Sequence, residues 1–267
     1  MYRFTYNLLF PAVCVLCDKP CGDFANTIPE SASRQHGLSE AAAIPRYQDL
    51  CRSCFQELPH NAVSCHRCAL PLSTGGHYST TAQTGILKCG KCLTSYSPID
   101  FALVPFVYRA PIDYMIKRLK FAGDIRFARL TSQLLCAAIN QHASPAPDFL
   151  LPVPAHPERF YRRGYNQAEQ LATRVSRCLS IPLGRNMIER TGSLQSSQAA
   201  LSATAREQNM RQAFGIKACC DKEAIAGKSV AIIDDVYTTG ATTRSMARVL
   251  RRAGAKKISV WAIARTP

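Results

Sequence analysis

The sequence predicts an α/β fold, in which helices flank a parallel sheet and a small cysteine-rich metal module precedes it. An apolar run at 230–233 leads without alternation into Asp234 and Asp235, which is typical of a strand covered on both faces of a parallel sheet. A hydroxyl-rich turn and an Ala/Arg/Leu-rich segment follow this strand, as expected for a helix after a tight loop. Nine of the 13 cysteines precede residue 93, so the metal module belongs to the first part of the chain.

Composition and charge divide the chain at about residue 98. The 267 residues, 47% of them apolar, are enough for a packed core. We expect a double zinc-ribbon module at 1–98 and an α/β domain at 99–267. Residues 1–98 contain eight Lys/Arg against six Asp/Glu, whereas 99–267 contain 25 against 12. This basic half favours a polyanion, either a small phosphorylated ligand or nucleic acid, although a merely soluble basic surface is the alternative.

The chain shows no sign of a membrane or export segment. It has no run of 18 apolar residues and therefore no predicted membrane span. The apolar start at 1–14 lacks both a leading Lys/Arg cluster and a cleavage site. We therefore expect a cytoplasmic location, where reducing conditions disfavour disulfides.

The cysteine module contains four Cys-x-x-Cys pairs. This spacing lets a tight turn direct two sulfurs to one metal, and two such turns complete a tetrahedron, so eight thiolates predict two Zn2+ ions. Reduced structural cysteines or redox pairs are the alternative. Spacing does not decide between sequential and alternating pairing, and we favour sequential. The predicted ligands are Cys14, Cys17, Cys51, Cys54, Cys65, Cys68, Cys89 and Cys92.

Three further features of this module are less regular. Cys21 and His66 are spare groups that could replace a ligand, but we expect both to be bystanders. The segment 22–48 is rich in Ala, Ser and Pro, and we interpret it as a mobile insertion. The metals should serve folding, because so few large apolar residues cannot build an adequate core.

The remaining elements follow from apolar periodicity and from Pro and Gly breaks. The helix expected at 110–122 has one apolar face, and Lys117, Arg118 and Lys120 lie on its other side. The predicted strands are 101–108, 149–153, 230–233 and 258–263, and the other predicted helices are 125–141, 168–178 and 241–252.

An Arg-rich loop follows the strand at 149–153. A loop that leaves the carboxyl end of a strand lies where open α/β sheets bind ligands. Guanidinium groups there suit a pyrophosphate, which they can hold through two parallel hydrogen bonds. A basic surface loop is the alternative. The candidate pyrophosphate-loop residues are Pro154, Ala155, His156, Arg159 and Arg163.

The segment 190–214 is polar and has few apolar anchors. We predict a mobile lid that closes over a reactive ligand and excludes water, with Gln198, Arg206 and Asn209 as its candidate residues. An ordinary surface loop with one short helix is the alternative.

The turn after 230–233 predicts a sugar-phosphate site. Backbone N–H groups at a helix N-terminus suit a phosphate monoester, and Gly240 allows the backbone to approach closely. Asp234 and Asp235 would repel a phosphate, so they should instead accept hydrogen bonds from sugar hydroxyls. The predicted ligand is a ribose 5-phosphate, whereas helix capping alone is the alternative. The candidate residues are Asp234, Asp235, Val236, Tyr237, Thr238, Thr239, Gly240, Ala241 and Thr242.

This segment resembles the signature of type I phosphoribosyltransferases, which bind 5-phosphoribosyl 1-pyrophosphate (PRPP). The resemblance implies a type I phosphoribosyltransferase-like sheet, in which Asp234 and Asp235 hold the ribose 2- and 3-hydroxyls. It further implies that 238–242 hold the 5-phosphate and that Mg2+ accompanies the bound PRPP. No Gly-Lys-Ser/Thr sequence is present, so a nucleoside triphosphate loop is not expected.

The order of motifs along the chain resembles the ComF family of competence-associated proteins. The family implies an accessory factor of natural transformation and DNA uptake that handles incoming single-stranded DNA and contacts competence or recombination proteins. The insertion at 22–48 and Cys21 depart from the family pattern. The motifs are the four cysteine pairs, Leu119-Lys-Phe121, Val153-Pro-Ala-His156, Arg163-Gly-Tyr-Asn-Gln167, Gln198-x-x-Leu201, Arg206-x-x-Asn209, Ala213-Phe214 and the Asp-Asp turn.

Two other functions fit the same residues. A PRPP-responsive regulator would keep the pocket without turnover, and we rank it second. A salvage pentosyltransferase would displace pyrophosphate by a base nitrogen, with Mg2+ on the pyrophosphate oxygens. We rank that enzyme third, because zinc ribbons have no part in its chemistry. The sequence assigns no catalytic residue, acceptor or oligomeric state.

Overall fold

The structure is a computed structural model that describes residues 13–21, 49–72, 78–80, 86–121, 124–142, 144–191, 213–219 and 222–267. Its centre is a parallel sheet, as predicted. The strand order is β3-β9-β8-β5, and β4 also pairs with β9. The predicted insertion at 22–48 and the lid residues Gln198, Arg206 and Asn209 lie outside the described residues.

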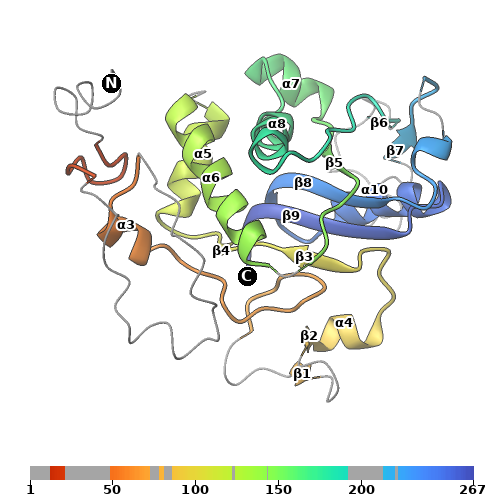
Figure 1. Cartoon of the computed structure of the whole chain (residues 1–267), viewed down its shortest axis with the longest axis horizontal. Coiled ribbons are helices and arrows are strands. Elements are labelled where there is room, and N and C mark those ends of the chain that lie inside the picture. The colour runs from red at the N-terminus through yellow and green to blue at the C-terminus, as the bar shows by residue number, and fades with distance from the viewer. Residues whose placement is uncertain are drawn as a thin grey trace, which may run out of the picture.

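The two longest strands of this sheet are β8 (Ser229–Tyr237) and β9 (Lys257–Arg265), which lie side by side at its centre (Figure 1). Strand β5 (Phe149–Pro152) pairs with β8 on one side. The strand predicted at 101–108 is instead two short strands, β3 (Phe101–Leu103) and β4 (Phe106–Val107). Pro105 separates them, because a proline has no N–H to donate to a continuous ladder.

Both faces of β8 are covered, as its unbroken apolar run predicted. Ala231 and Ile233 pack into one core with helices α5 (Ile112–Phe121), α6 (Ile125–Gln141) and α8 (Gln167–Leu179). The intervening Val230 and Ile232 pack into a second core with α10 (Ala241–Arg252). Figure 1 shows this layering, with α10 behind the two central strands. Strand alternation thus supplies two cores from one apolar run.

The bounds of the four predicted helices match the predictions closely. Helices α6 and α10 have the predicted bounds, and α5 and α8 differ from them by one or two residues at each described end. A helix that was not predicted, α7 (Pro157–Arg163), lies in a segment that was predicted to be a loop. Pro157 lies at the start of this helix, where its missing N–H costs nothing. The ends of the predicted lid form an antiparallel pair, β6 (Ile188–Arg190) with β7 (Phe214–Ile216), and η2 (Lys222–Ala224) is a single 3₁₀ turn.

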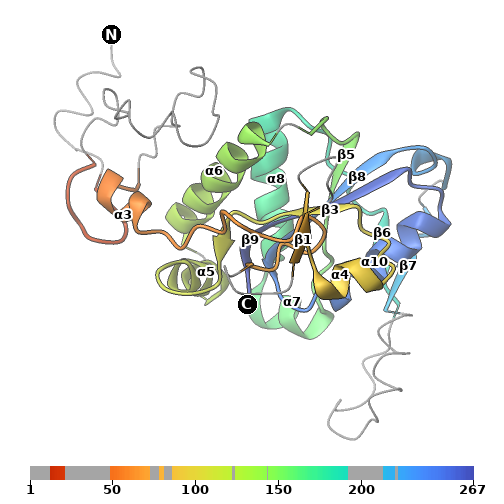
Figure 2. The same cartoon turned by 90° about the horizontal axis from the view of Figure 1, so that it is seen from below.

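The cysteine-rich part folds into two small units that lie apart from each other in both views (Figures 1 and 2). One contains helix α3 (Arg52–Gln56), and the other contains α4 (Gly90–Thr94) and the antiparallel pair β1 (Tyr78–Thr80) and β2 (Leu87–Cys89). Over the described ranges, no helix is both long enough and apolar enough to span a membrane.

Candidate functional site

The acid pair lies within strand β8 rather than after its end, which corrects the predicted strand boundary. Asp234 is opposite Ala262 of β9, and the ladder continues to Tyr237. The backbone N–H of Asp235 donates to Asp234 Oδ1 at 2.9 Å, and the N–H of Val236 donates to Asp235 Oδ1 at 2.8 Å. These two bonds fix both carboxylates at the carboxyl end of the sheet, the edge where open α/β sheets bind ligands.

The negative charges of Asp234 and Asp235 repel each other, and one nearby cation offsets part of that repulsion. Burial, and then the negative charge of Asp235, raises the pKa of Asp234 to about 8, whereas the charge of Lys120 acts in the opposite direction. Lys120 Nζ lies 2.8 Å from Asp235 Oδ2. The sequence placed Lys120 on the side of its helix away from the apolar face, and in the structure this side chain reaches the acids. Only its place in the Leu119-Lys-Phe121 motif could have indicated this role.

The turn between β8 and α10 has the geometry expected of an anion site. Gly240 adopts a φ of +71°, and a Cβ added there would lie 2.6 Å from the ring of Tyr237. Thr238 and Thr239 are exposed, whereas Thr243 is buried and donates to the Gly240 carbonyl. Helix α10 begins at Ala241, so its first N–H groups have no acceptor within the helix and can meet a phosphate.

The candidate pyrophosphate loop begins beside the acid pair. Strand β5 is parallel to β8, and the N–H of Val153 donates to the Ile233 carbonyl, one residue before Asp234. Asn166 Nδ2 donates to the Val153 carbonyl at 3.0 Å, and Arg190 Nε donates to the Pro154 carbonyl at 2.9 Å. The structure therefore brings 154–156 and the acids to the same edge of the sheet and fixes the start of that loop from two sides.

The arginines predicted to grip pyrophosphate are placed differently from that expectation. Of the predicted pyrophosphate loop, only 154–156 lie outside a helix, because His156 is the N-cap of α7 and the arginines lie on this helix. Arg163 is half-buried and donates to Gln167 Oε1 at 3.0 Å. The side chain of Arg159 lies outside the described part of the chain.

The eight predicted metal ligands form two clusters, and their grouping is sequential, as favoured. Cys14, Cys17, Cys51 and Cys54 form cluster 1, and Cys65, Cys68, Cys89 and Cys92 form cluster 2. Within each cluster all four sulfurs lie within 4.8 Å of one another. The Cys17–Cys51 and Cys68–Cys89 sulfur distances are 3.6 and 3.8 Å. A zinc tetrahedron with Zn–S bonds of about 2.3 Å has edges of about 3.8 Å, so each cluster fits one zinc ion.

The two spare groups lie outside both clusters. Cys21 is half-buried near cluster 1, but its sulfur is not among the four of that cluster that lie within 4.8 Å of one another. His66 packs against the ring of Phe101, with centroids 5.7 Å apart.

A buried arginine connects cluster 2 to the phosphate turn. Arg265, near the end of β9, is 8% exposed. Its Nε donates to the Cys68 carbonyl at 2.9 Å, and one of its terminal nitrogens donates to the Tyr237 carbonyl at 3.2 Å. Its guanidinium also lies 5.3 Å from the centre of the Tyr237 ring. No sequence pattern indicates this connection, because Cys68, Tyr237 and Arg265 are remote from one another in the chain.

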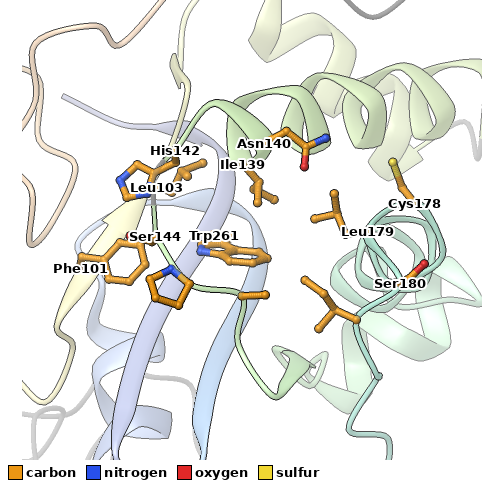
Figure 3. A pocket seen from close by; sticks show the side chains of 13 residues that line it. Phe101, Leu103, Ile139, Asn140, His142, Ser144, Cys178, Leu179, Ser180 and Trp261 are labelled. Carbon is orange, nitrogen blue, oxygen red and sulfur yellow. The ribbon is translucent and has the colours of Figure 1, made fainter. Parts of the chain in front are cut away.

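A separate cavity of about 390 Å³ lies between the C-terminal ends of α6 and α8 and the face of β9 (Figure 3). None of the predicted ligand residues lines it. Trp261 forms part of its wall, and the indole nitrogen has no hydrogen-bond partner among the described residues. The cavity is lined by Phe101, Leu103, Ile139, Asn140, His142, Ser144, Pro145, Ala146, Cys178, Leu179, Ser180, Ile181 and Trp261.

Comparison with known proteins agrees with this arrangement. Residues 162–267 match the phosphoribosyl transferase domain family, and this range includes the acid pair and the phosphate turn. The chain is 34% identical over 194 residues to competence protein F of Haemophilus influenzae, covering 71% of this chain and 83% of that protein. It is 31% identical over 222 residues to the DNA utilization protein YhgH of Escherichia coli K12, covering 81% and 90%.

A more distant relative is competence protein ComFC of Streptococcus pneumoniae, with 23% identity over 160 residues, 60% of this chain and 66% of that protein. The matches to the Haemophilus and Escherichia proteins extend over most of both chains. The chain therefore belongs to the ComF family of competence-associated proteins with a phosphoribosyltransferase fold.

Proposed function

We propose that this protein binds PRPP at the carboxyl edge of its sheet and acts in the handling of incoming single-stranded DNA during natural competence. The observation on which the PRPP assignment rests is the position of Asp234 and Asp235 between the start of α10 and the loop at 154–156. This arrangement offers carboxylate acceptors for sugar hydroxyls and N–H donors for a phosphate at one edge of the sheet.

Each part of the ligand has a chemically matched partner. The ribose 2- and 3-hydroxyls donate to Asp234 and Asp235, and the 5-phosphate accepts from the N–H groups and hydroxyls of 238–242. The pyrophosphate lies toward 154–156, and Mg2+ accompanies it, since this cation is commonly bound through substrate phosphates. The two cysteine clusters hold one structural Zn2+ each, which stabilises the folded state.

The DNA assignment rests on family membership and on an exposed surface of α7. Phe160 and Tyr161 are 46% and 86% exposed on this helix, and Arg162 beside them is exposed. Proteins that bind single strands commonly stack bases on aromatic side chains and pair cations with the backbone. Helix α7 directly follows the loop at 154–156, so a strand bound there would lie next to the PRPP site.

The PRPP assignment is tested by calorimetry with the D234N/D235N variant. We expect wild-type protein to bind PRPP in the presence of Mg2+ and the double variant to lose at least 100-fold in affinity, because two charge-assisted hydrogen-bond acceptors are removed, each contributing about 1.5–3 kcal/mol. Equal affinity of the two proteins would refute the assigned ribose contact. Thermal unfolding of the variant provides the folding control.

The competing functions are separated by two further measurements. Fluorescence anisotropy with a labelled single strand should show weaker binding by a Phe160→Ala/Tyr161→Ala variant, with PRPP affinity retained. Release of pyrophosphate on addition of a nucleobase would favour the salvage pentosyltransferase. PRPP-dependent change in DNA affinity, without pyrophosphate release, would favour the PRPP-responsive regulator.

A further inference from the structure

Lys120 is distinguished from the other cations of helix α5 by where its side chain goes. Lys117 pairs with Asp113 one turn away on the same helix, and its side chain is 58% exposed. The side chain of Lys120 is only 23% exposed, and its ammonium lies 2.8 Å from Asp235 Oδ2 on strand β8. Long cationic side chains normally extend their charged groups into solvent. A lysine whose ammonium instead lies against a nearly buried carboxylate therefore stabilises the charge of that carboxylate.

The position of Lys120 is set by the segment that also fixes the candidate pyrophosphate loop. The Tyr165 hydroxyl donates a short hydrogen bond to the carbonyl of Leu119, the residue before Lys120. The next residue, Asn166, donates to the Val153 carbonyl and caps helix α8. Tyr165 and Asn166 therefore hold the last turn of α5 and the loop after β5 in fixed positions relative to each other. This arrangement places the Lys120 ammonium beside the acid pair.

We propose that Lys120 is a positioning residue of the sugar-binding acids, whose ammonium pairs with Asp235 and favours the ionised, hydroxyl-accepting form of Asp234. This inference rests on the proposed function, since it assigns the acids to the ribose hydroxyls. It gives the lysine of the Leu119-Lys-Phe121 motif a role in the site.

The electrostatics of the pair support this role. A carboxylate accepts hydrogen bonds through both oxygens only when it is ionised. Burial and the charge of Asp235 raise the pKa of Asp234, and Lys120 is the cation that lowers it. Asp235 and Lys120 are the charged groups that act on Asp234. Loss of the ammonium should therefore raise the pKa of Asp234 further and lower the ionised fraction of this carboxyl at neutral pH.

The test is the pH profile of PRPP binding by calorimetry between pH 6.5 and 9, with wild type, Lys120→Met, Lys120→Arg and Lys117→Met. Binding should strengthen as pH rises through the pKa of Asp234, because ionisation of this carboxyl creates a charged acceptor. Lys120→Met should bind about tenfold more weakly at pH 7, with the rise displaced upward by about one unit or more, the usual effect of a nearby opposite charge. Lys120→Arg should restore most of the affinity, and Lys117→Met should match wild type.

A second measurement needs no ligand. The carboxyl ¹³C resonance of Asp234 should titrate at higher pH in Lys120→Met than in wild type, and thermal unfolding should show that the variant is folded. An unchanged titration together with an unchanged binding profile would overturn the role of Lys120. If wild-type protein fails to bind PRPP while the titration still shifts, the proposed ligand is wrong but the electrostatic coupling stands. If the titration alone is unchanged, Lys120 does not act through ionisation and the inference fails.

Discussion

The two cysteine clusters are built from the same local structure. In cluster 1 the N–H of Cys14 donates to the Lys19 carbonyl, and in cluster 2 the N–H of Cys65 donates to the Leu70 carbonyl, five residues ahead in each case. The residue after each of these Cys-x-x-Cys turns, Asp18 or Ala69, has a positive φ. Each cluster also includes a short helix, α3 or α4, that begins directly after a cysteine.

The clusters differ in what surrounds them. Cluster 1 packs on the core of α5 and α6, and Asp49 beside it accepts from Arg129 Nε of α6 at 2.7 Å. Cluster 2 is joined through the Cys68 carbonyl to Arg265, and through Arg265 to Tyr237 at the phosphate turn. The N–H of Ala102 also donates to the carbonyl of His66, within the Cys65–Cys68 turn. One cysteine cluster thus contacts a core helix, and the other is connected to the predicted ligand site.

Removal of each cluster in turn should have the largest effect, and it tests whether the two clusters differ in their influence on PRPP binding. Cys65→Ser/Cys68→Ser should lower the zinc content from two ions to one and also weaken PRPP binding at least tenfold, because the support of Tyr237 is lost. Cys14→Ser/Cys17→Ser should remove one zinc ion and leave PRPP affinity within twofold of wild type. Metal analysis and calorimetry measure both. Equal losses of PRPP binding in the two variants would show that the clusters are equivalent.

A narrower change cuts the connection and leaves both clusters intact. Arg265→Met removes the hydrogen bonds to Cys68 and Tyr237 from a buried position, which should destabilise the protein by about 2–4 kcal/mol. PRPP affinity should fall about tenfold while the zinc content stays at two ions, as measured by calorimetry and metal analysis. Unchanged affinity in a folded variant would contradict the proposed support of the turn.

The smallest effect is expected at the matching contact of cluster 1. Arg129→Met breaks the ion pair with Asp49, which is 6% exposed, and should lower the free energy of unfolding by about 1–3 kcal/mol. Chemical denaturation measures this change. PRPP affinity and zinc content should both stay at wild-type values, and a loss of PRPP binding would remove the distinction between the two contacts.

The sequence predicted the parts of the molecule that depend on local signals. The strand, turn and helix at 230–252 follow from an apolar run, a glycine and a helical pattern, and the cysteine spacing predicted the two clusters. Side chains that act across the fold could not be predicted, because Lys120 and Arg265 reach partners far along the chain. Helix α7 was missed because the prolines before it favoured a loop, although Pro157 is well placed at its first turn.

Trp261 is the single tryptophan of the chain, and its place on β9 has a practical consequence. It is opposite Ile233 in the ladder, and Ile233 immediately precedes the acid pair. Its ring faces the cavity under α6 and α8, so its emission reports on the interior and needs no dye. A change in the tryptophan emission spectrum on addition of a sugar phosphate would therefore show that a displacement of β8 reaches the interior of the protein around this cavity.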